Sequence, residues 1–330
     1  MGRMGRRMTS AKRALVTGAT GMVGSALVRR LLDERADVVA LVLDADPQSE
    51  LYRSGTVNAT TVVNGALEDL PTIERAIAVH EPDTVFHLGA QTLVGAAHHA
   101  PVRTREANVR GTWNVLEACR RNPEVVRSVV VASSDKAYGT VDALPYVETM
   151  ALGGREPYEV SKAAADLIAQ MYAHAYGVPA VIARCGNIYG PGDLNWSRIV
   201  PGTIRSLLYG ERPVLRSDGT FVRDYLHVDD VVDAYLTLAA AVLNGGLAPG
   251  EAVNFSDESP LTVRELYDAV CDAVGVPGTE PEILNRAPGE IHDQWLSAAK
   301  ARSVLEWKPQ VDLAPGLTRT VAWYRSFLAA

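Results

Sequence analysis

Cysteine is scarce in this sequence, and its three occurrences, Cys119, Cys185 and Cys271, follow no pattern. Structural zinc sites use closely spaced cysteines, and secreted disulfide proteins use many more of them. His98 and His99, which we expect at the start of a helix, offer no metal-ligand spacing either. The sequence therefore predicts reduced thiols, a cytoplasmic location and no metal site.

The sequence also lacks long apolar runs and a net positive charge. No apolar run reaches the ~20 residues that a membrane-spanning helix needs. The net charge is −7 and the pI is near 5.6, which argues against nucleic-acid or membrane partners. The one basic cluster, MGRMGRRMTSAKR at the N-terminus, lacks the apolar core of a secretory signal. We expect a disordered tail or an expression remnant there.

Short apolar runs alternate with helical stretches along the first part of the chain. At 330 residues, 47% hydrophobic and 22% charged, the chain suits one large or two modest globular domains. Alternating strands and helices predict an α/β fold with a doubly wound parallel sheet. The expected strands are residues 13–17, 37–43, 61–64, 83–88, 128–132 and 178–183.

A glycine-rich segment, TGATGMVG, follows the first expected strand and precedes a helix that runs to about Arg35. Strand, glycine loop and helix N-terminus together can hold a pyrophosphate with backbone N–H groups. Gly18 would allow the tight turn, Gly21 the approach of phosphate, and Gly24 close packing of the helix. A plain tight turn is the alternative. The flanking elements favour a dinucleotide, held by the backbone from Gly18 through Thr20, Gly21, Met22 and Val23.

Asp44 ends the second expected strand, 26 positions after Gly18. A carboxylate there can accept hydrogen bonds from the adenosine ribose and would repel a 2′-phosphate, which predicts NAD rather than NADP. A turn role for Asp44 is the alternative, with Asp46 as a substitute ligand. After the strand at 83–88, Leu88, Gly89 and Ala90 would let backbone lie against the cofactor.

The stretch from 128 to 162 holds the candidate catalytic centre. A Val-rich strand at 128–132 delivers Ser134, Asp135 and Lys136 at its end, and a helix from Pro157 to Gly177 carries Tyr158 and Lys162 one turn apart. A phenol titrates near pH ~10, so it needs a nearby cation to act as a base. An isolated pair of this kind is usually an exposed contact. The neighbouring serine and acid favour catalysis.

Asn108 stands in an amphipathic helix, EANVRGTWNVLEACR, with two roles open. If it is buried, its side chain can hydrogen-bond backbone at a kink. A ligand contact is equally compatible with the sequence.

With TGATGMVG, SSDKAYG and Tyr158-xxx-Lys162 in this order, the chain resembles the extended short-chain dehydrogenases/reductases that act on nucleotide sugars, namely epimerases and dehydratases. The resemblance runs from about residue 12 to 326 and includes ARCGNIYGPGD and RDYLHVDD. It implies tightly bound NAD, a nucleotide-diphosphate hexose substrate and a homodimer built on the helices near 100–120 and 158–176.

The resemblance also implies roles for single residues. Tyr158 would be the base for the sugar 4-hydroxyl, Lys162 would hold the nicotinamide ribose, and Ser134 would share the proton network. Guanidinium suits a diphosphate because it donates two parallel hydrogen bonds, although any one arginine could be a surface ion pair instead. The implied substrate-binding residues are Gln91, Asn187, Arg198, Arg216 and Arg223, with Arg223 the strongest phosphate candidate. His227 is expected to support the fold rather than to catalyse.

Ser134-Asp135-Lys136 distinguishes between the branches of the family. It is similar to the CDP-glucose 4,6-dehydratase pattern, as GAQTLV is to AAQPLV, whereas epimerases usually have small or hydroxyl residues after the serine. Elimination of water needs an acid and a base, which Asp135 and Lys136 could supply. Two segments depart from this branch: GALED has Ala66 where the family has an acid, and RDYLHVDD resembles other branches.

We therefore expect a Rossmann-like NAD domain over residues 12–186 and a smaller α/β substrate domain over 187–330, with about 225–255 returning to the first. The expected activity is an NAD-dependent NDP-hexose 4,6-dehydratase. A nucleotide-sugar 4-epimerase is the alternative. A non-catalytic NAD-binding regulator is a third possibility, against which the intact Ser134, Tyr158 and Lys162 argue.

Overall fold

The computed structural model describes residues 11–141, 143–286 and 290–329. Most of the basic N-terminal segment lies outside the described residues. Within the described ranges no helix is long and apolar enough to cross a membrane.

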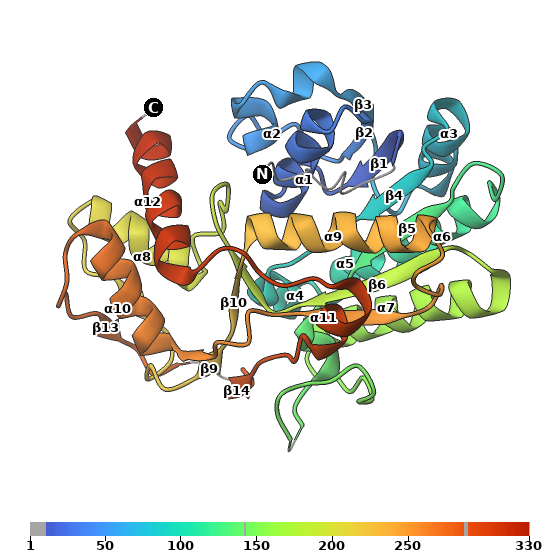
Figure 1. Ribbon diagram of the computed structural model, residues 1–330. Helices are drawn as coiled ribbons and strands as arrows, with labels where there is room; N and C mark the ends of the chain where they lie inside the picture. The colour runs from blue at the N-terminus through green and yellow to red at the C-terminus, as the bar shows by residue number, and fades with distance from the viewer. Residues whose placement is uncertain (1–10, 142, 287–289, 330) are drawn as a thin grey trace, which may run out of the picture.

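Seven parallel strands form the main sheet in the order β11-β6-β5-β4-β1-β2-β3 (Figure 1). The order reverses between β1 and β4, and ligands of such sheets bind at this point, beyond the carboxyl ends of the strands. The sheet confirms the predicted doubly wound α/β class. Its strands are β1 (Arg13–Thr17), β2 (Asp37–Val42), β3 (Thr61–Asn64), β4 (Thr84–His87), β5 (Ser128–Ala132), β6 (Ala180–Cys185) and β11 (Ala252–Phe255).

Helices cover both faces of this sheet, and each face has its own apolar core. One core joins the sheet to α1 (Met22–Asp33) and α9 (Val228–Leu243). The other joins it to α3 (Leu70–His80), α6 (Gly111–Arg120) and α7 (Pro157–Tyr176). Short helices complete this part: α2 (Glu50–Arg53), η1 (Thr56–Ala59), α4 (Val94–His99), α5 (Pro101–Arg105), η2 (Glu106–Arg110), η3 (Asp135–Tyr138) and α11 (Ala299–Leu305).

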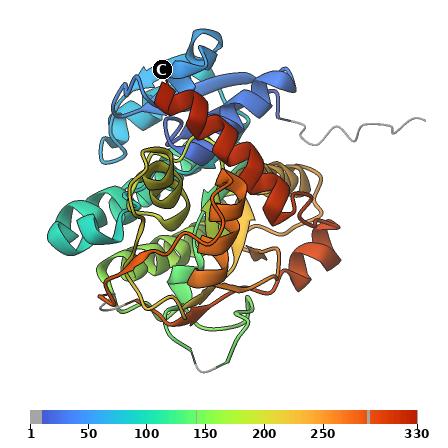
Figure 2. The ribbon, with the colours of Figure 1, turned by 90° about the vertical axis from the view of Figure 1, so that its left-hand side faces the viewer.

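A second, smaller body lies beside the carboxyl edge of the sheet (Figures 1 and 2). Its core joins α8 (Ile199–Leu208), α10 (Val263–Val274) and α12 (Leu313–Ala329). Its short strands pair as β10-β7, β12-β9-β14 and β13-β8. They are β7 (Asn187–Tyr189), β8 (Val214–Leu215), β9 (Val222–Arg223), β10 (Tyr225–His227), β12 (Leu261–Thr262), β13 (Glu282–Ile283) and β14 (Asp293–Gln294).

The chain leaves the main sheet after β6 and comes back to it. Helix α9 packs on the face shared with α1, and β11 pairs in parallel with β6 at the edge of the sheet. The division at residue 186 that the sequence suggests stays a prediction.

Several predicted boundaries need correction. Helix α1 ends at Asp33, because Arg35 adopts a left-handed conformation with φ 64°. Strand β6 is Ala180–Cys185 rather than 178–183, and β2 and β4 are each shorter at their ends. His98 and His99 end α4 instead of beginning a helix. The helix expected at 106–120 begins with a π-helical turn, η2, before α6.

Candidate active site

The turn between β1 and α1 requires glycine at position 18. Gly18 has φ +70°, and a Cβ there would lie 2.7 Å from the backbone nitrogen of Gly89. A Cβ on Gly24 would overlap the Gly18 carbonyl, so the third glycine allows the helix to approach the strand, as predicted. A Cβ on Gly21 would lie 3.4 Å from the Gly18 oxygen, so the protein itself leaves space beside that residue.

Helix α1 begins directly after this turn. Gly21 is its N-cap, and no side chain in the described part of the chain caps it. The backbone of Thr20, Gly21, Met22 and Val23 thus forms a helix N-terminus whose N–H groups and dipole suit a pyrophosphate. The turn and the uncapped helix fit a dinucleotide.

The end of β4 lies against the turn between β1 and α1, and we call the two together the cofactor cradle. The backbone N–H groups of Leu88 and Gly89 donate to Thr17 Oγ1 at 3.1 and 3.0 Å, and Ala90 follows them. Thr17 Oγ1 also lies 2.9 Å from His87 Nδ1, on a buried ring whose pKa is lowered to about 3, mainly by burial. Sequence reasoning missed His87, which helps to hold the end of β4 as a neutral side chain.

Asp44 lies just past the end of β2 with an exposed side chain. Because β1 and β2 are neighbouring parallel strands with Thr17 opposite Leu41, Asp44 and Gly18 follow their strands at the same edge. This is the placement that contact with an adenosine ribose requires.

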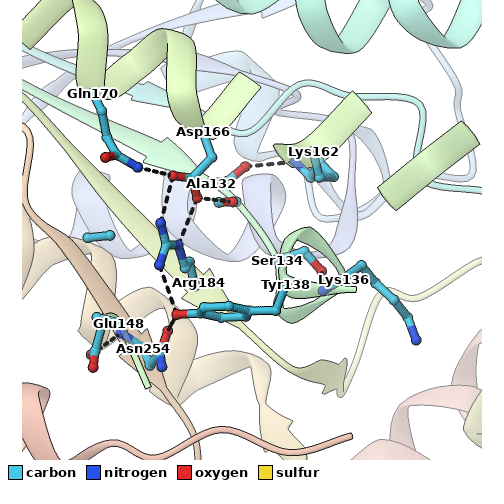
Figure 3. Close-up of polar contacts among 12 residues, drawn as sticks. Ala132, Ser134, Lys136, Tyr138, Glu148, Lys162, Asp166, Gln170, Arg184 and Asn254 are labelled. Carbon is cyan, nitrogen blue, oxygen red and sulfur yellow. Dashed lines mark hydrogen bonds and ion pairs between the residues drawn. The ribbon is translucent and has the colours of Figure 1, made fainter. Parts of the chain in front are cut away.

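The predicted Ser-Asp-Lys triplet follows β5, with Ser134 as the N-cap of the η3 turn and Asp135 and Lys136 as its first residues. Figure 3 shows Ser134 and Lys136. Ser134 Oγ donates to Asp135 Oδ1 at 2.8 Å and accepts from the Lys136 backbone at 3.2 Å. Asp135 is 2% exposed, and burial raises the pKa of its carboxyl against the opposing charge of Lys136. Burial lowers the pKa of the Lys136 amine, although Asp135 opposes this. The two groups sit where an acid can keep its proton and an amine can lose one.

Helix α7 supplies Tyr158 and Lys162 in its first turns. Burial raises the pKa of Tyr158 to about 12, and both the charge of Arg198 and a hydrogen bond with Ser134 act to lower it. Lys162 Nζ donates to the Ala132 carbonyl at 2.7 Å, and burial lowers its pKa to about 8. The structure thus brings Ser134, Tyr158 and Lys162 to one place.

Arg223 is the most deeply buried of the three predicted arginines. It is 6% exposed, its charge lowers the pKa of Asp135, and its guanidinium donates to the carbonyls of Val222, Ile291 and His292. Arg198 pairs with Asp193 at 3.0 Å, and its charge acts on Tyr158.

The other three predicted substrate contacts differ in setting. Asn187 begins β7, and its Nδ2 donates to the Asp224 carbonyl at 3.4 Å. The backbone N–H of Gln91 donates to Asn108 Oδ1 at 2.6 Å. Arg216 has a side chain that is 60% exposed and pairs with Glu290, the surface ion-pair alternative for such an arginine.

Asn108 lies in the π-helical turn and is buried. It accepts from Gln91 N, while its Nδ2 donates to the Gln91 carbonyl and to Ser161 Oγ. The backbone role left open by the sequence is therefore present.

Several polar groups beside the triplet escaped sequence reasoning. Lys136 Nζ donates to Gln294 Oε1 from β14, more than 150 residues away in the chain. Asp224 is buried with its pKa raised to about 7, chiefly by burial and then by Asp135. No local spacing links these residues, because the two bodies of the fold bring them together. Within the described ranges no group of histidines, cysteines and carboxylates could hold a metal ion.

Comparison with known proteins agrees with this geometry. The model of the NAD dependent epimerase/dehydratase family matches residues 14–254. A UDP-glucose 4-epimerase of Mycolicibacterium smegmatis is 34% identical over 95% of this chain and 99% of its own length. A dTDP-glucose 4,6-dehydratase of Streptomyces antibioticus is 33% identical over 94% and 92%. A CDP-glucose 4,6-dehydratase of Salmonella typhimurium is 29% identical over 96% and 91%.

Among solved structures, a dTDP-glucose 4,6-dehydratase of Streptomyces venezuelae with NAD bound superposes with a TM-score of 0.85 at 29% identity. The match covers 95% of this chain and 97% of that one. Its NAD agrees with the cofactor cradle. The chain belongs to the NAD-dependent epimerase/dehydratase family, and NAD is its cofactor.

Proposed function

We propose that the protein is an NAD-dependent NDP-hexose 4,6-dehydratase. The observation that carries this proposal is the pairing of Asp135, whose pKa is raised by burial, with Lys136, whose pKa is lowered by burial, directly after Ser134. Loss of water needs a protonated acid and a neutral base beyond the groups that oxidise the sugar.

Oxidation at C4 would use the Ser134, Tyr158 and Lys162 group. Tyr158 accepts the 4-hydroxyl proton, with Ser134 as its hydrogen-bond partner, while Lys162 contacts the nicotinamide ribose. NAD, held at the turn from Gly18 to Val23, would supply the hydride chemistry at C4 and C6. Burial raises the pKa of the Tyr158 phenol to about 12, and the charge of Arg198 opposes this shift, towards the ionised form that a base requires.

Elimination would follow because a 4-keto group acidifies the C5 proton. Lys136 takes that proton as the C5–C6 double bond forms, the C6–O bond breaks, and Asp135 protonates the departing hydroxyl so that it leaves as water. A proton returned to C5 and the hydride at C6 complete a 4-keto-6-deoxy sugar. Burial shifts the pKa of each residue towards the protonation state that its step needs.

The nucleotide diphosphate would lie between the two bodies of the fold. A guanidinium has five N–H donors, of which Arg223 spends three on backbone carbonyls, so two can face a phosphate. Asn187, Arg198 and Gln91 are the further proposed contacts. Arg216, which is exposed and paired, is the weakest of the set.

Mass spectrometry of CDP-, dTDP-, UDP- and GDP-hexoses incubated with the enzyme tests the proposal. We expect one of them to lose the mass of water, and Tyr158→Phe to lower turnover by about a hundredfold, or ~2.7 kcal/mol of barrier, while binding persists. Absence of a dehydrated product with every sugar, while C4 epimers interconvert, would reject the dehydratase. Near-normal turnover in Tyr158→Phe would reject the proposed base.

A nucleotide-sugar 4-epimerase is the second candidate, because the relative from Mycolicibacterium smegmatis carries that name at 34% identity. An epimerase returns the hydride to the other face of C4 and needs neither Asp135 nor Lys136 as acid or base. A non-catalytic NAD-binding regulator would bind the sugar nucleotide without changing it, so the same incubation separates all three.

We also propose a homodimer in the cytoplasm, with a cofactor domain over 12–186 and a substrate domain over 187–330. Apolar side chains are exposed on one side of α7, at Val160, Leu167 and Met171, and on the nearby α5, at Val102. Their spacing along α7 repeats every seven and four residues, which places them on one helix face. A second copy of the chain would cover them.

A further inference from the structure

The η3 turn that carries Asp135 and Lys136 is only four residues long, and its own hydrogen bonds are few. Ala137 N donates to the Ser134 carbonyl at 3.1 Å and Gly139 N to the Lys136 carbonyl at 3.2 Å. A single 3₁₀ turn of this kind has poor hydrogen-bond geometry. Its position therefore depends on what holds it from outside.

Tyr138, the last residue of the turn, fixes it through contacts of its hydroxyl and its ring. Its hydroxyl donates to Asn254 Oδ1 at 2.8 Å and accepts from Arg184 Nη1 at 2.8 Å. The ring is 1% exposed and stacks on Tyr146 with centroids 4.9 Å apart. Burial raises the pKa of the phenol, so it keeps the proton that it donates to Asn254.

Arg184 ties this phenol to the helix that bears Lys162 (Figure 3). Its Nε and Nη2 donate to the two Asp166 oxygens at 2.8 and 2.9 Å, and both residues are buried. Asp166 lies one turn after Lys162 on α7 and also accepts from Ser133 Oγ at 2.6 Å. The Asp166 carboxylate, on the helix that carries Lys162, therefore binds both Arg184 and Ser133, the residue before Ser134.

Asn254 ties the same phenol to the returning strand β11 and to the loop before α7. Its backbone N–H donates to Glu148 Oε1 at 2.8 Å, and its Nδ2 donates to the Tyr146 carbonyl at 3.1 Å. The Tyr138 hydroxyl thus stands between a fixed cation on β6 and a fixed amide on β11. Moving it would leave Nη1 of the buried Arg184 without this hydrogen-bond partner, which is unfavourable.

We propose that Tyr138 is a positioning residue, whose hydroxyl, held between Arg184 and Asn254, sets the place of Asp135 and Lys136 relative to Ser134, Tyr158 and Lys162. The groups that oxidise C4 have further contacts of their own, because Lys162 Nζ donates to the Ala132 carbonyl and Ser133 Oγ donates to Asp166 on α7. Tyr138 therefore governs the elimination step more than the oxidation step. This division of labour rests on the proposed dehydratase function.

Tyr138→Phe tests the inference, because it keeps the stacked ring and removes only the hydroxyl. With the sugar nucleotide that the wild-type enzyme dehydrates, we expect water loss to slow about tenfold or more. Small misplacements of reacting groups have large effects on rate. Hydride exchange at C4 and KM should stay within about threefold, so that NADH accumulates during turnover.

Tyr267→Phe is the matched control. Tyr267 is also a fully buried tyrosine, and its hydroxyl donates to the Thr279 carbonyl at 3.0 Å within the smaller body. In Tyr267→Phe, the rates of water loss and of hydride exchange at C4 should equal those of the wild type. If Tyr138→Phe slows the two steps equally, or slows neither, its hydroxyl does not position the acid and base.

Hydrogen exchange of the backbone separates this inference from the proposed function. Without any substrate, exchange over residues 133–139 should be faster in Tyr138→Phe than in the wild type and in Tyr267→Phe. If the wild type forms no dehydrated product yet this exchange is faster, the dehydratase proposal fails and the positioning role stands. Unchanged exchange overturns the positioning role whatever the reaction.

Discussion

At the scale of single residues, Asp135 is where a dehydratase and an epimerase differ. Asp135→Asn keeps the acceptor for Ser134 Oγ but has no proton to give. We expect water loss to fall by about a hundredfold or more, the range for a lost general acid, while C4 oxidation continues. Product mass and transient NADH measure the two steps.

Asp218→Asn is the control for that substitution, since Asp218 lies in an exposed turn where it accepts from Thr220. Unchanged water loss in Asp135→Asn would assign Asp135 to substrate binding instead.

Asp44 offers a separate prediction about cofactor choice. Asp44→Ala should weaken NAD by about tenfold and leave NADP unchanged or tighter, because hydrogen bonds from the ribose to a carboxylate are lost. Titration of the cofactor-free protein with each nucleotide measures this. Asp46→Ala is the control, because Asp46 Oδ1 accepts from Gln48 N within the turn. If the NAD preference is retained in Asp44→Ala but lost in Asp46→Ala, Asp46 and not Asp44 contacts the ribose.

At the scale of elements, the start of α7 depends on a reciprocal cap. The Glu159 carboxylate accepts from the backbone of Arg155 and Glu156 at 3.0 and 3.3 Å, and the Glu156 side chain caps the helix in return. Glu159→Ala should lower the free energy of unfolding by about 1 kcal/mol, whereas Glu159→Gln, which can still accept, should lose less. Urea denaturation measures both, and equal stability of all three proteins would contradict the cap.

Local sequence signals predicted the elements that form the turn between β1 and α1 and the helix that carries Tyr158 and Lys162. The glycine spacing after β1, the proline before Tyr158 and the Val-rich β5 each have a local physical cause. The ends were less accurately predicted: Val178 and Pro179 continue the apolar pattern of β6, but its pairing with β5 begins at Ala180 and its pairing with β11 at Ile182.

The residues that sequence reasoning missed act only through distant partners. Tyr138, Arg184 and Asn254 stand on η3, β6 and β11, and only the sheet order makes them neighbours. Gln294 reaches Lys136 from the smaller body. A composition or spacing rule cannot detect such contacts, because no fixed interval in the sequence corresponds to them.

At the scale of the whole molecule, stability should depend on pH through Asp224. Its pKa is about 7 in the folded protein against 3.8 ordinarily, so between these values the folded chain keeps a proton that the unfolded chain releases. Its contribution to the free energy of unfolding is therefore complete below about pH 4 and falls as the pH rises towards about 7.

Asp224→Asn removes this titration. The wild type should lose stability relative to the variant over that window, by at most about 1.4 kcal/mol per pH unit. Urea denaturation at about pH 5 and about pH 8 measures the difference. Parallel pH dependence in the two proteins would show that Asp224 titrates normally.

Assembly is tested at the same scale. Leu167→Glu places a charge on the exposed apolar face of α7 and should convert a dimer to a monomer in analytical ultracentrifugation, since burying an unpaired charge costs several kcal/mol. Val304→Glu, on an exposed apolar residue of α11, is the control and should leave the mass unchanged. A monomeric wild type would reject the dimer.

The late pairing of β11 with β6 bears on how this chain can be recombined with its relatives. Because Ala252–Phe255 completes a sheet begun at Arg13, a chimera joined once, after Cys185, would combine α9 and β11 of one parent with the sheet of the other. Such a hybrid would mismatch the packing of α9 and expose or distort the edge of β6, which invites aggregation. Exchanging the smaller body alone therefore requires two grafted segments, one on each side of residues 228–255.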